Sequence, residues 1–279
     1  MLDRELVEAV KLAREAGRIL LELYALRESQ PRDFGVDMKG EADPVTEADR
    51  RVNAFLTARL REAFPTDTII AEESANEGRR ASGRCWLVDP LDGTKEFIAR
   101  NGEFSVMIGL AIDGDAQLGV VYQPTTGKLW RGVVGDGAFV EQDDKTFVLR
   151  PSDVSDPSKM KLVVSRSHRS AETDAIVQRL GITQEAASGS VGLKVGLIAE
   201  RKADLYVHLS DRSSAWDACA PDAILRAAGG TFTDLSGRSI EYGTSELRNK
   251  RGILACNRKG FEKVLPIVSE IARGAGLIE

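Results

Sequence analysis

The chain has 279 residues, of which 42% are hydrophobic, and its formal net charge at pH 7 is -5. That length allows a substantial core, and we expect two packed halves, residues 1–155 and 156–279, divided within the Pro- and Asp-containing stretch 150–159, with one large domain as the alternative. The acidic net charge argues against nucleic-acid binding. The longest apolar run is too short to cross a bilayer, and the three scattered cysteines indicate neither disulfides nor a zinc site. We therefore expect a cytoplasmic protein, with peripheral membrane contact as the alternative.

Helical spacing of apolar residues predicts an amphipathic helix at the start of the chain. After an expected loop over 30–44, Thr46 is suited to cap a second helix, which Pro65 ends. Short apolar runs separated by Gly, Asp or Pro then predict a largely antiparallel sheet. These expected strands cover 69–71, 86–88, 104–112, 117–122 and 128–134.

From about residue 161 the pattern alternates between strand and helix, which predicts an α/β half after an α+β first half. The expected strands cover 162–165, the surroundings of Ala186, 205–208 and 253–255. The expected helices cover 171–180, 191–200, 218–228 and 261–273.

The stretch 86–97 is the most informative part of the sequence, because an expected strand delivers Asp89 and Asp92 at its end. Pro90 fixes φ and forces a turn, so both carboxylates can converge on one point. Two carboxylates that close repel each other unless a divalent cation lies between them, and hard oxygen ligands suit Mg²⁺. The pattern therefore indicates a magnesium site at this strand end.

Two other interpretations of the same stretch are open. Asp92 and Gly93 are a familiar turn dipeptide, although a turn needs neither the apolar strand before it nor Thr94 after it. An aspartyl-nucleophile phosphatase would need an Asp-x-Asp spacing, which Pro90 prevents here. If a helix opens after the strand, the amides of Gly93 and Thr94 would face an anionic phosphate.

Further acidic residues stand at the ends of other expected elements: Asp49, the pair Glu72 and Glu73, and Asp217. Each has a structural explanation, since Asp49 can complete a capping box with Thr46, Asp217 can be an N-cap, and the glutamates can be solvated. Four acidic clusters on segments that could meet between two halves are better explained together, by a multi-metal site.

The motifs that carry a resemblance are Asp43-Pro-Val-Thr-Glu-Ala-Asp49, Ala71-Glu-Glu-Ser74, Asp89-Pro-Leu-Asp-Gly-Thr94, and Trp216-Asp217 followed by Ala228-Gly-Gly230. With these motifs in this order, the chain resembles the lithium-sensitive inositol monophosphatase superfamily over nearly its whole length. The stretches 95–104, 165–168 and 189–194 are similar to its CysQ-type 3'(2'),5'-bisphosphate nucleotidase branch. The resemblance implies a layered αβαβα sandwich of the inositol monophosphatase and fructose-1,6-bisphosphatase type.

Two residues depart from the family pattern. Ala71 stands where the family usually has Gly, which is not expected to remove a ligand. Pro221 stands in the helix after Asp217, where small residues are usual. We expect Pro221 in or near the first turn, where a missing N–H is tolerated, with only an indirect effect on Asp217.

The resemblance also implies a set of metal ligands. Glu72, Asp89 and the main-chain oxygen of Leu91 would bind one Mg²⁺, and Asp89, Asp92 and Asp217 would bind a second, roughly 3.5 to 4 Å away. A third, weaker ion near Glu72 is a feature of similar enzymes. Lithium inhibition is expected by the same analogy.

Catalysis would then use a water molecule held by Thr94, without a covalent intermediate, and Asp49 or a neighbouring carboxylate would orient Thr94. The expected catalytic residues are Thr94, Asp49, Glu72 and Asp92. The expected substrate contacts are Gly93, Thr94, Ser167, His168, Ser190, Lys194, Arg212 and Asp217, with Lys194 and Arg212 supplying charge for an additional phosphate.

The implied reaction is hydrolysis of 3'-phosphoadenosine 5'-phosphate to AMP and phosphate, which would clear a by-product of sulfate assimilation. The nearest alternative is an inositol-1-phosphate or sugar-phosphate monoesterase with the same metal site, and a second is a catalytically silent metal-binding module. The only partner expected is a small phosphorylated substrate, and the protein is expected to be a monomer or homodimer.

Overall fold

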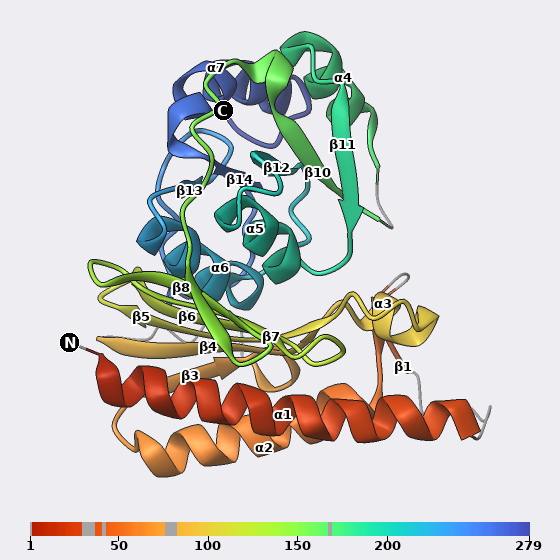
Figure 1. Ribbon diagram of the computed structural model, residues 1–279, viewed down its shortest axis with the longest axis vertical. Coiled ribbons are helices and arrows are strands. Elements are labelled where there is room, and N and C mark those ends of the chain that lie inside the picture. Colours follow the sequence, from red (N-terminus) through yellow and green to blue (C-terminus); the bar gives the residue numbers. More distant parts are fainter. Residues whose placement is uncertain (1, 30–36, 41–42, 76–82, 167–168) are drawn as a thin grey trace.

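The computed structural model describes residues 2–29, 37–40, 43–75, 83–166 and 169–279, and its elements stack in five layers. From the bottom to the top of Figure 1, two helices, a sheet, two helices, a second sheet and two more helices follow one another. This order confirms the expected αβαβα sandwich.

The larger sheet has seven strands that lie side by side in chain order. They are β3 (Thr68–Ala71), β4 (Arg84–Asp92), β5 (Ser105–Ile112), β6 (Asp115–Gln123), β7 (Lys128–Val133), β8 (Gly137–Gln142) and β9 (Lys145–Val148). Only the β3–β4 pair is parallel. All of β4 after Arg84 is buried, because helices cover both faces of the sheet at this strand.

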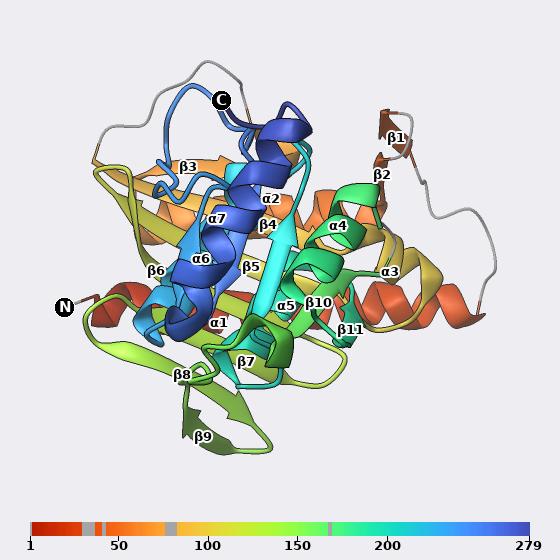
Figure 2. The same cartoon turned by 90° about the horizontal axis from the view of Figure 1, so that it is seen from above.

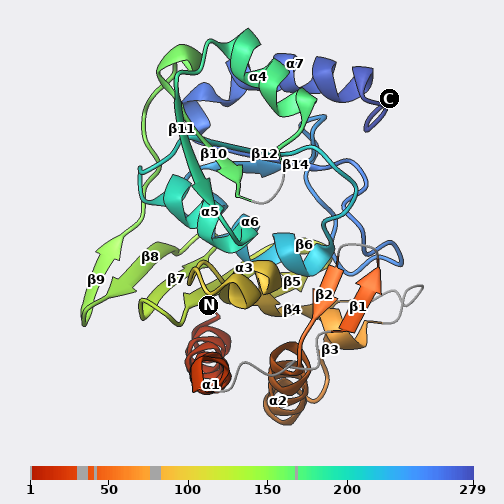
Figure 3. The same ribbon diagram turned by 90° about the vertical axis from the view of Figure 1, so that its right-hand side faces the viewer.

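Two helices cover the outer face of the larger sheet, α1 (Asp3–Ser29) and α2 (Glu47–Ala63) (Figures 1 and 3). Their apolar stripes pack on the sheet, with Leu12 and Leu20 on α1 and Leu56 on α2 inaccessible to solvent. As the sequence predicts, Thr46 caps α2 and the helix ends before Pro65.

The smaller sheet has five strands in the order β11-β10-β12-β14-β13. They are β10 (Lys161–Ser165), β11 (Gln184–Ser188), β12 (Leu205–His208), β13 (Thr231–Thr233) and β14 (Ile253–Cys256). β10 runs parallel to β11 and β12, and β14 runs antiparallel to β12 and β13. Its outer face carries α4 (Ala171–Leu180) and α7 (Arg258–Gly274), so the smaller half has the expected α/β character.

The middle layer consists of α5 (Val191–Ala199) and α6 (Ala215–Ala227), between the two sheets. Glycines let α6 approach the larger sheet closely. A Cβ atom at Gly119 of β6 would lie 2.1 Å from the carbonyl oxygen of Ala220, and one at Gly109 of β5 would lie 2.7 Å from Sγ of Cys219. This packing also brings α6 against β4, the strand that carries Asp89 and Asp92.

Several elements were not predicted. The expected loop over 30–44 contains an antiparallel pair, β1 (Asp37–Gly40) and β2 (Asp43–Val45), which have no apolar alternation to indicate strands. β8 and β9 form a hairpin that projects from the molecule (Figure 2), and β9 is exposed along its whole length, so it has no buried face to produce a pattern. β13 has only three residues.

The helix after Trp216 differs from the expectation at its start. α6 begins at Ala215 and not at 218, because Ser214 is its N-cap and forms a capping box with Asp217. Asp217 is therefore the third helical residue and not the N-cap. Pro221 lies in the second turn and not in or near the first, so the carbonyl of Asp217 lacks the amide that would normally bond it four residues later.

Among the described residues, no helix has the length and apolar content needed to cross a membrane. The three cysteines are buried and unpaired, as expected. The chain between the two sheets, residues 149–160, includes the predicted boundary, although the division at 155 stays a prediction.

Candidate active site

Four acidic residues lie within electrostatic reach of one another between the two halves. Asp89 and Asp92 end β4, Glu72 begins the short 3₁₀ helix η1 (Glu72–Ser74) after β3, and Asp217 lies in the first turn of α6. Burial raises the pKa of Asp89 well above its usual range, and the charges of Glu72, Asp92 and Asp217 raise it further. The electrostatic field at this point favours a cation.

Asp217 is held against the same group of acids. Removal from water, followed by the charges of Glu72 and Asp92, raises the pKa of Asp217, while hydrogen bonds that it accepts from the Ser214 amide and from the Asp89 side chain lower it. The Ser214 amide donates to Oδ2 of Asp217 at 2.7 Å. The capping box thus serves a second purpose, because it fixes the carboxylate beside Asp89.

Asp49 forms hydrogen bonds with both of its expected partners, Thr46 and Thr94. One of its oxygens, Oδ2, accepts hydrogen bonds from the amide and hydroxyl of Thr46 at 2.7 and 2.5 Å. The other, Oδ1, accepts a bond of 3.0 Å from the hydroxyl of Thr94. Burial raises the pKa of Asp49, and the bonds from Thr46 and Thr94 oppose that rise. A structural cap and an orienting contact therefore share one carboxylate.

The turn between β4 and the next helix places the remaining N-terminal candidates. The amide of Leu91 donates to Oδ1 of Asp89 at 2.9 Å, and the carbonyl oxygen of Leu91 lies 3.2 Å from the Thr94 hydroxyl. Gly93, at φ 102°, precedes the short helix α3 (Thr94–Ala99). A side chain there would meet the carbonyl of Glu103 at 3.0 Å, so the turn requires glycine.

Asp92 faces the start of α5. Its Oδ2 accepts hydrogen bonds from the hydroxyl of Ser190 and, at 3.0 Å, from the amide of Gly192. Burial raises the pKa of Asp92, and the charge of Lys194 and these bonds lower it. Ser190 therefore bonds a predicted metal ligand, although it was expected to contact the substrate.

Lys194 is almost completely buried, with 3% of its surface exposed. Its ammonium group donates to the carbonyl of Gly189 at 2.7 Å and lies 5.2 Å from the ring centroid of Tyr206. Burial lowers the pKa of Lys194 to about 8, against the charges of Asp92, Glu96 and other acids. Its positive charge is thus directed at the acidic residues of the site, and its contact with a substrate phosphate stays a prediction.

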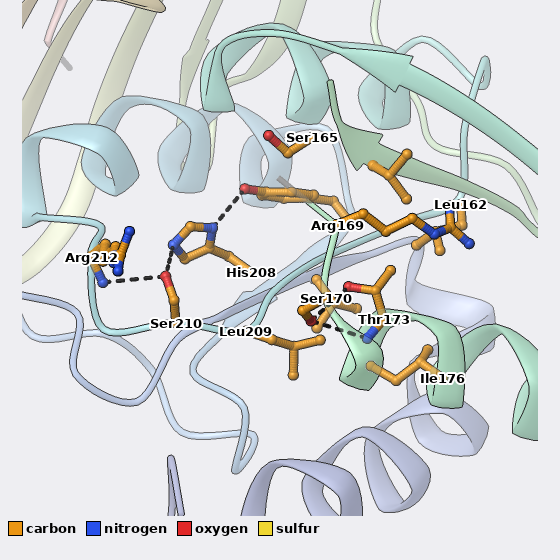
Figure 4. Close-up of a pocket in the computed structure, with 13 residues that line it drawn as sticks. Leu162, Ser165, Arg169, Ser170, Thr173, Ile176, His208, Leu209, Ser210 and Arg212 are labelled. Atoms are coloured by element: carbon orange, nitrogen blue, oxygen red, sulfur yellow. Dashed lines mark hydrogen bonds between the residues drawn. The ribbon is translucent and has the colours of Figure 1, made fainter. Parts of the chain in front are cut away.

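A pocket of about 480 Å³ opens between α4 and the segment after β12 (Figure 4). Leu162, Val164 and Ile176 form apolar walls, and His208 and Arg212 supply polar groups. Tyr206 also lines the pocket. Burial raises the pKa of its hydroxyl, and the charges of Asp92 and Asp217 raise it further. Through Tyr206 the pocket lies within electrostatic reach of Asp92 and Asp217, although neither acid is in its lining.

A chain of hydrogen bonds crosses the pocket lining (Figure 4). Nδ1 of His208 lies 3.3 Å from the Tyr206 hydroxyl, and Nε2 lies 2.9 Å from the hydroxyl of Ser210, which accepts from the Arg212 amide at 3.3 Å. Our sequence reasoning missed Tyr206, His208 and Ser210. The only sequence feature that could have indicated them is their position at or just after the end of the expected strand 205–208, in the segment that leads to Trp216.

Two expected contacts, Ser167 and His168, lie outside the described residues. Arg212 is exposed at the pocket, and within the described ranges no acidic side chain is recorded as its partner. Glu96 and Glu103, which act on Lys194, were also missed, because neither stands at the end of an apolar strand.

The donor chemistry of the site fits a hard divalent cation. All four acidic residues offer carboxylate oxygens, which Mg²⁺ prefers. The pKa values of Asp89 and Asp217 are raised first by burial and then by the neighbouring acidic charges, and a cation would relieve that repulsion. In the described part of the chain no three acidic, histidine or cysteine side chains stand in a coordinating arrangement. The fit therefore rests on donor type and proximity.

Comparison with known proteins agrees with this chemistry. A model of the inositol monophosphatase family matches residues 1–273. The chain is 37% identical to the 3'(2'),5'-bisphosphate nucleotidase CysQ of Escherichia coli strain K12 over 237 residues, which are 84% of this chain and 92% of that protein. It is 31% identical to the CysQ protein of Aggregatibacter actinomycetemcomitans, over 86% of this chain and 88% of that one.

Solved structures give the same picture. CysQ from Bacteroides thetaiotaomicron matches with a TM-score of 0.75 and 30% identity, covering 91% of this chain and 97% of that one. The Thermotoga maritima IMPase matches with a TM-score of 0.78 and 24% identity, covering 97% and 98% of the two chains. This second likeness bears on the fold alone.

Proposed function

The chain belongs to the inositol monophosphatase family, and we propose that within it the protein is a Mg²⁺-dependent 3'(2'),5'-bisphosphate nucleotidase that converts 3'-phosphoadenosine 5'-phosphate to AMP and phosphate. One observation carries the substrate assignment. A pocket of about 480 Å³, a size suited to a nucleoside, lies within electrostatic reach of Asp92 and Asp217 through Tyr206 and has the cationic Arg212 in its lining. The 37% identity to CysQ supports the same assignment.

Glu72, Asp89 and the carbonyl of Leu91 would hold one Mg²⁺, and Asp89, Asp92 and Asp217 would hold a second, with a third, weaker ion near Glu72. When bound, such ions lower the pKa of water and stabilise the charge that develops on phosphate. These ligands come from the first proposed half, residues 1–155, except for Asp217. Inhibition by lithium stays a prediction.

The chain's own residues hold the water that attacks phosphorus. The Thr94 hydroxyl donates its proton towards Asp49 Oδ1 at 3.0 Å, which leaves its lone pairs to accept a hydrogen bond from that water. Because Asp49 is locked by Thr46, it keeps the Thr94 hydroxyl in this orientation. Glu72 and Asp92 are the nearby carboxylates that can receive the water proton.

The substrate would lie across both halves. The amides of Gly93 and Thr94 would receive the phosphate that is removed, with Asp217 near the leaving oxygen. The rest of the nucleotide would enter the pocket, where Arg212 would meet the second phosphate. Ser167 and His168 remain proposed contacts from the sequence.

The assignment is tested by measuring phosphate release from 3'-phosphoadenosine 5'-phosphate and from inositol-1-phosphate in Mg²⁺. We expect kcat/KM for the bisphosphate nucleotide to be at least about 100-fold higher, because a paired second phosphate contributes on the order of 3 kcal/mol. A preference for inositol-1-phosphate would reject the nucleotidase assignment and leave an inositol-phosphate or sugar-phosphate monoesterase.

A further inference from the structure

We propose that Ser190 is a positioning residue that fixes the rotation of the Asp92 carboxylate, so that Oδ1 is the oxygen presented to a bound cation. The inference rests on the proposed role of Asp92 as a metal ligand. It gives Ser190 a function different from substrate contact.

Both recorded hydrogen bonds to the Asp92 side chain end on the same oxygen. The Ser190 hydroxyl and the Gly192 amide, at 3.0 Å, donate to Oδ2, and in the described part of the chain no donor is recorded for Oδ1. A carboxylate rotates about a broad, two-fold torsion, so packing alone sets its plane poorly. Two donors on one oxygen set that plane and turn Oδ1 away from α5.

The hydroxyl of Ser190 has no hydrogen-bonding capacity left for a substrate. It donates its single proton to Asp92, accepts from the amide of Leu193 at 3.1 Å, and lies 2.9 Å from the hydroxyl of Ser105. Since a hydroxyl offers one donor and two acceptor sites, Ser105 must be the donor in the last contact. Ser190 is also only 5% exposed and Ser105 is inaccessible. A substrate contact would break one of these bonds.

The backbone of Ser190 is held in a conformation that it would not adopt unaided. Its φ of 34° is positive, which is unusual for a residue other than glycine. The preceding residue, Gly189, donates to Glu103 Oε2 at 2.7 Å and accepts from Lys194 at 2.7 Å. Arg166 in turn binds both oxygens of Glu103. These bonds hold the turn in place.

The other end of α5 is anchored to the larger sheet as well. Glu200, directly after the helix, accepts from the Lys128 ammonium at 2.6 Å and from the Trp130 indole at 2.7 Å. Both partners lie on β7, in the sheet that also carries Asp92 on β4. The position of α5 relative to Asp92 is therefore fixed at both helix ends, as a positioning role requires.

The proposal is tested with Ser190→Ala and Ser190→Gly, by titrating Mg²⁺ alone into each protein in a calorimeter. We expect the Kd for Mg²⁺ to rise about tenfold in both, since removal of a group that orients a ligand typically costs 10- to 100-fold. Glycine accepts a positive φ, so equal effects would assign the loss to the hydroxyl. At saturating Mg²⁺, kcat should fall about tenfold while KM stays within about twofold.

Two further variants keep the result interpretable. Ser269→Ala also loses a buried serine bond, to the carbonyl of Leu235 at 2.6 Å, but lies on α7 in the outer layer, so Mg²⁺ affinity and kcat should not change. Asp92→Asn should weaken Mg²⁺ binding more than either Ser190 variant. If Asp92→Asn leaves the affinity unchanged, the ligand role fails and this inference fails with it.

If Asp92→Asn weakens binding but Ser190→Ala does not, only the positioning role is rejected. The same conclusion follows if Ser190→Ala raises KM about tenfold with kcat and Mg²⁺ affinity unchanged, because that result is the signature of a substrate contact. Circular dichroism and Tm of each variant establish that it is folded.

Discussion

The Thr94 hydroxyl lies 3.0 Å from Oδ1 of Asp49, and this bond joins the first turn of α3 to the first turn of α2. The second oxygen of Asp49 is occupied by Thr46. Because the capping box with Thr46 fixes Asp49, the direction of the Thr94 hydroxyl is set before any ligand binds. The pair is the part of the site that is most fully formed by the protein alone.

Replacement of Thr94 tests that arrangement. Thr94→Val keeps the shape of the side chain but removes the hydroxyl, so we expect kcat to fall about 10²- to 10³-fold, the usual contribution of a group that positions and deprotonates water. Thr94→Ser should keep most of the activity. Steady-state phosphate release measures both, and a Thr94→Val enzyme within about twofold of the unmodified protein would exclude the proposed role.

Arg212 separates the two candidate substrates. Arg212→Ala should raise KM for 3'-phosphoadenosine 5'-phosphate about tenfold or more, because a charge-assisted contact with the second phosphate is lost, and should leave KM for inositol-1-phosphate unchanged. Arg61→Ala, which removes another exposed arginine at the end of α2, is the matched control. Equal changes for both substrates would show that Arg212 does not read the second phosphate.

The ion pair at the end of α5 is expected to matter for stability. Glu200→Ala would leave the Lys128 ammonium, whose side chain is 11% exposed, without its carboxylate, and we expect a loss of about 3 kcal/mol in the free energy of unfolding. The exposed pair of Arg59 and Glu62 is the contrast, since Glu62→Ala should cost less than about 0.5 kcal/mol. Urea denaturation measures both, and similar small losses would contradict the prediction.

A buried acid on α6 should make stability depend on pH. Asp222 is 2% exposed and accepts a hydrogen bond from the Tyr242 hydroxyl at 2.8 Å. The guanidinium of Arg226 lies 3.8 Å from Oδ1 of Asp222 and also binds Asp115. Burial raises its pKa to about 7, against the opposing charge of Arg226. The folded state therefore binds a proton more tightly than the unfolded state, and this stabilisation is lost as pH rises from about 4 to about 7.

Asp222→Asn tests the sign of that effect. An amide resembles the protonated acid, so the stability advantage of the variant over the unmodified protein should grow by about 2 kcal/mol between pH 5.5 and pH 8.5. Comparing the two proteins at each pH cancels every other titration. An identical difference at both values would mean that Asp222 does not titrate in this range.

Much of the site could be predicted because its acids follow directly from local chain geometry. Asp89 and Asp92 end an apolar strand, and Asp49 stands three residues after an N-cap, so spacing alone indicates them. The surroundings of Ser190 could not be predicted. Two contacts depend on how α5 packs between the two sheets: the bond of Ser190 to Asp92 and the position of the Lys194 ammonium over the Tyr206 ring. No local sequence pattern indicates that packing.

The same distinction applies to the fold. Apolar runs and caps predicted the strands and helices that bury a continuous face, including α2 and β5. β9 was not predicted because it has no buried face. The capping box of Ser214 and Asp217 starts α6 earlier than the apolar pattern suggests, and this earlier start places Pro221 in the second turn.

The most direct test of the metal assignment is a crystal soaked in Mn²⁺, a substitute for Mg²⁺ whose anomalous scattering locates it. The account predicts anomalous peaks among the carboxylates of Glu72, Asp89, Asp92 and Asp217, with Oδ1 of Asp92 facing the ion and Oδ2 still bonded to Ser190. Peaks elsewhere, or none beside Asp89 at saturating Mn²⁺, would contradict it.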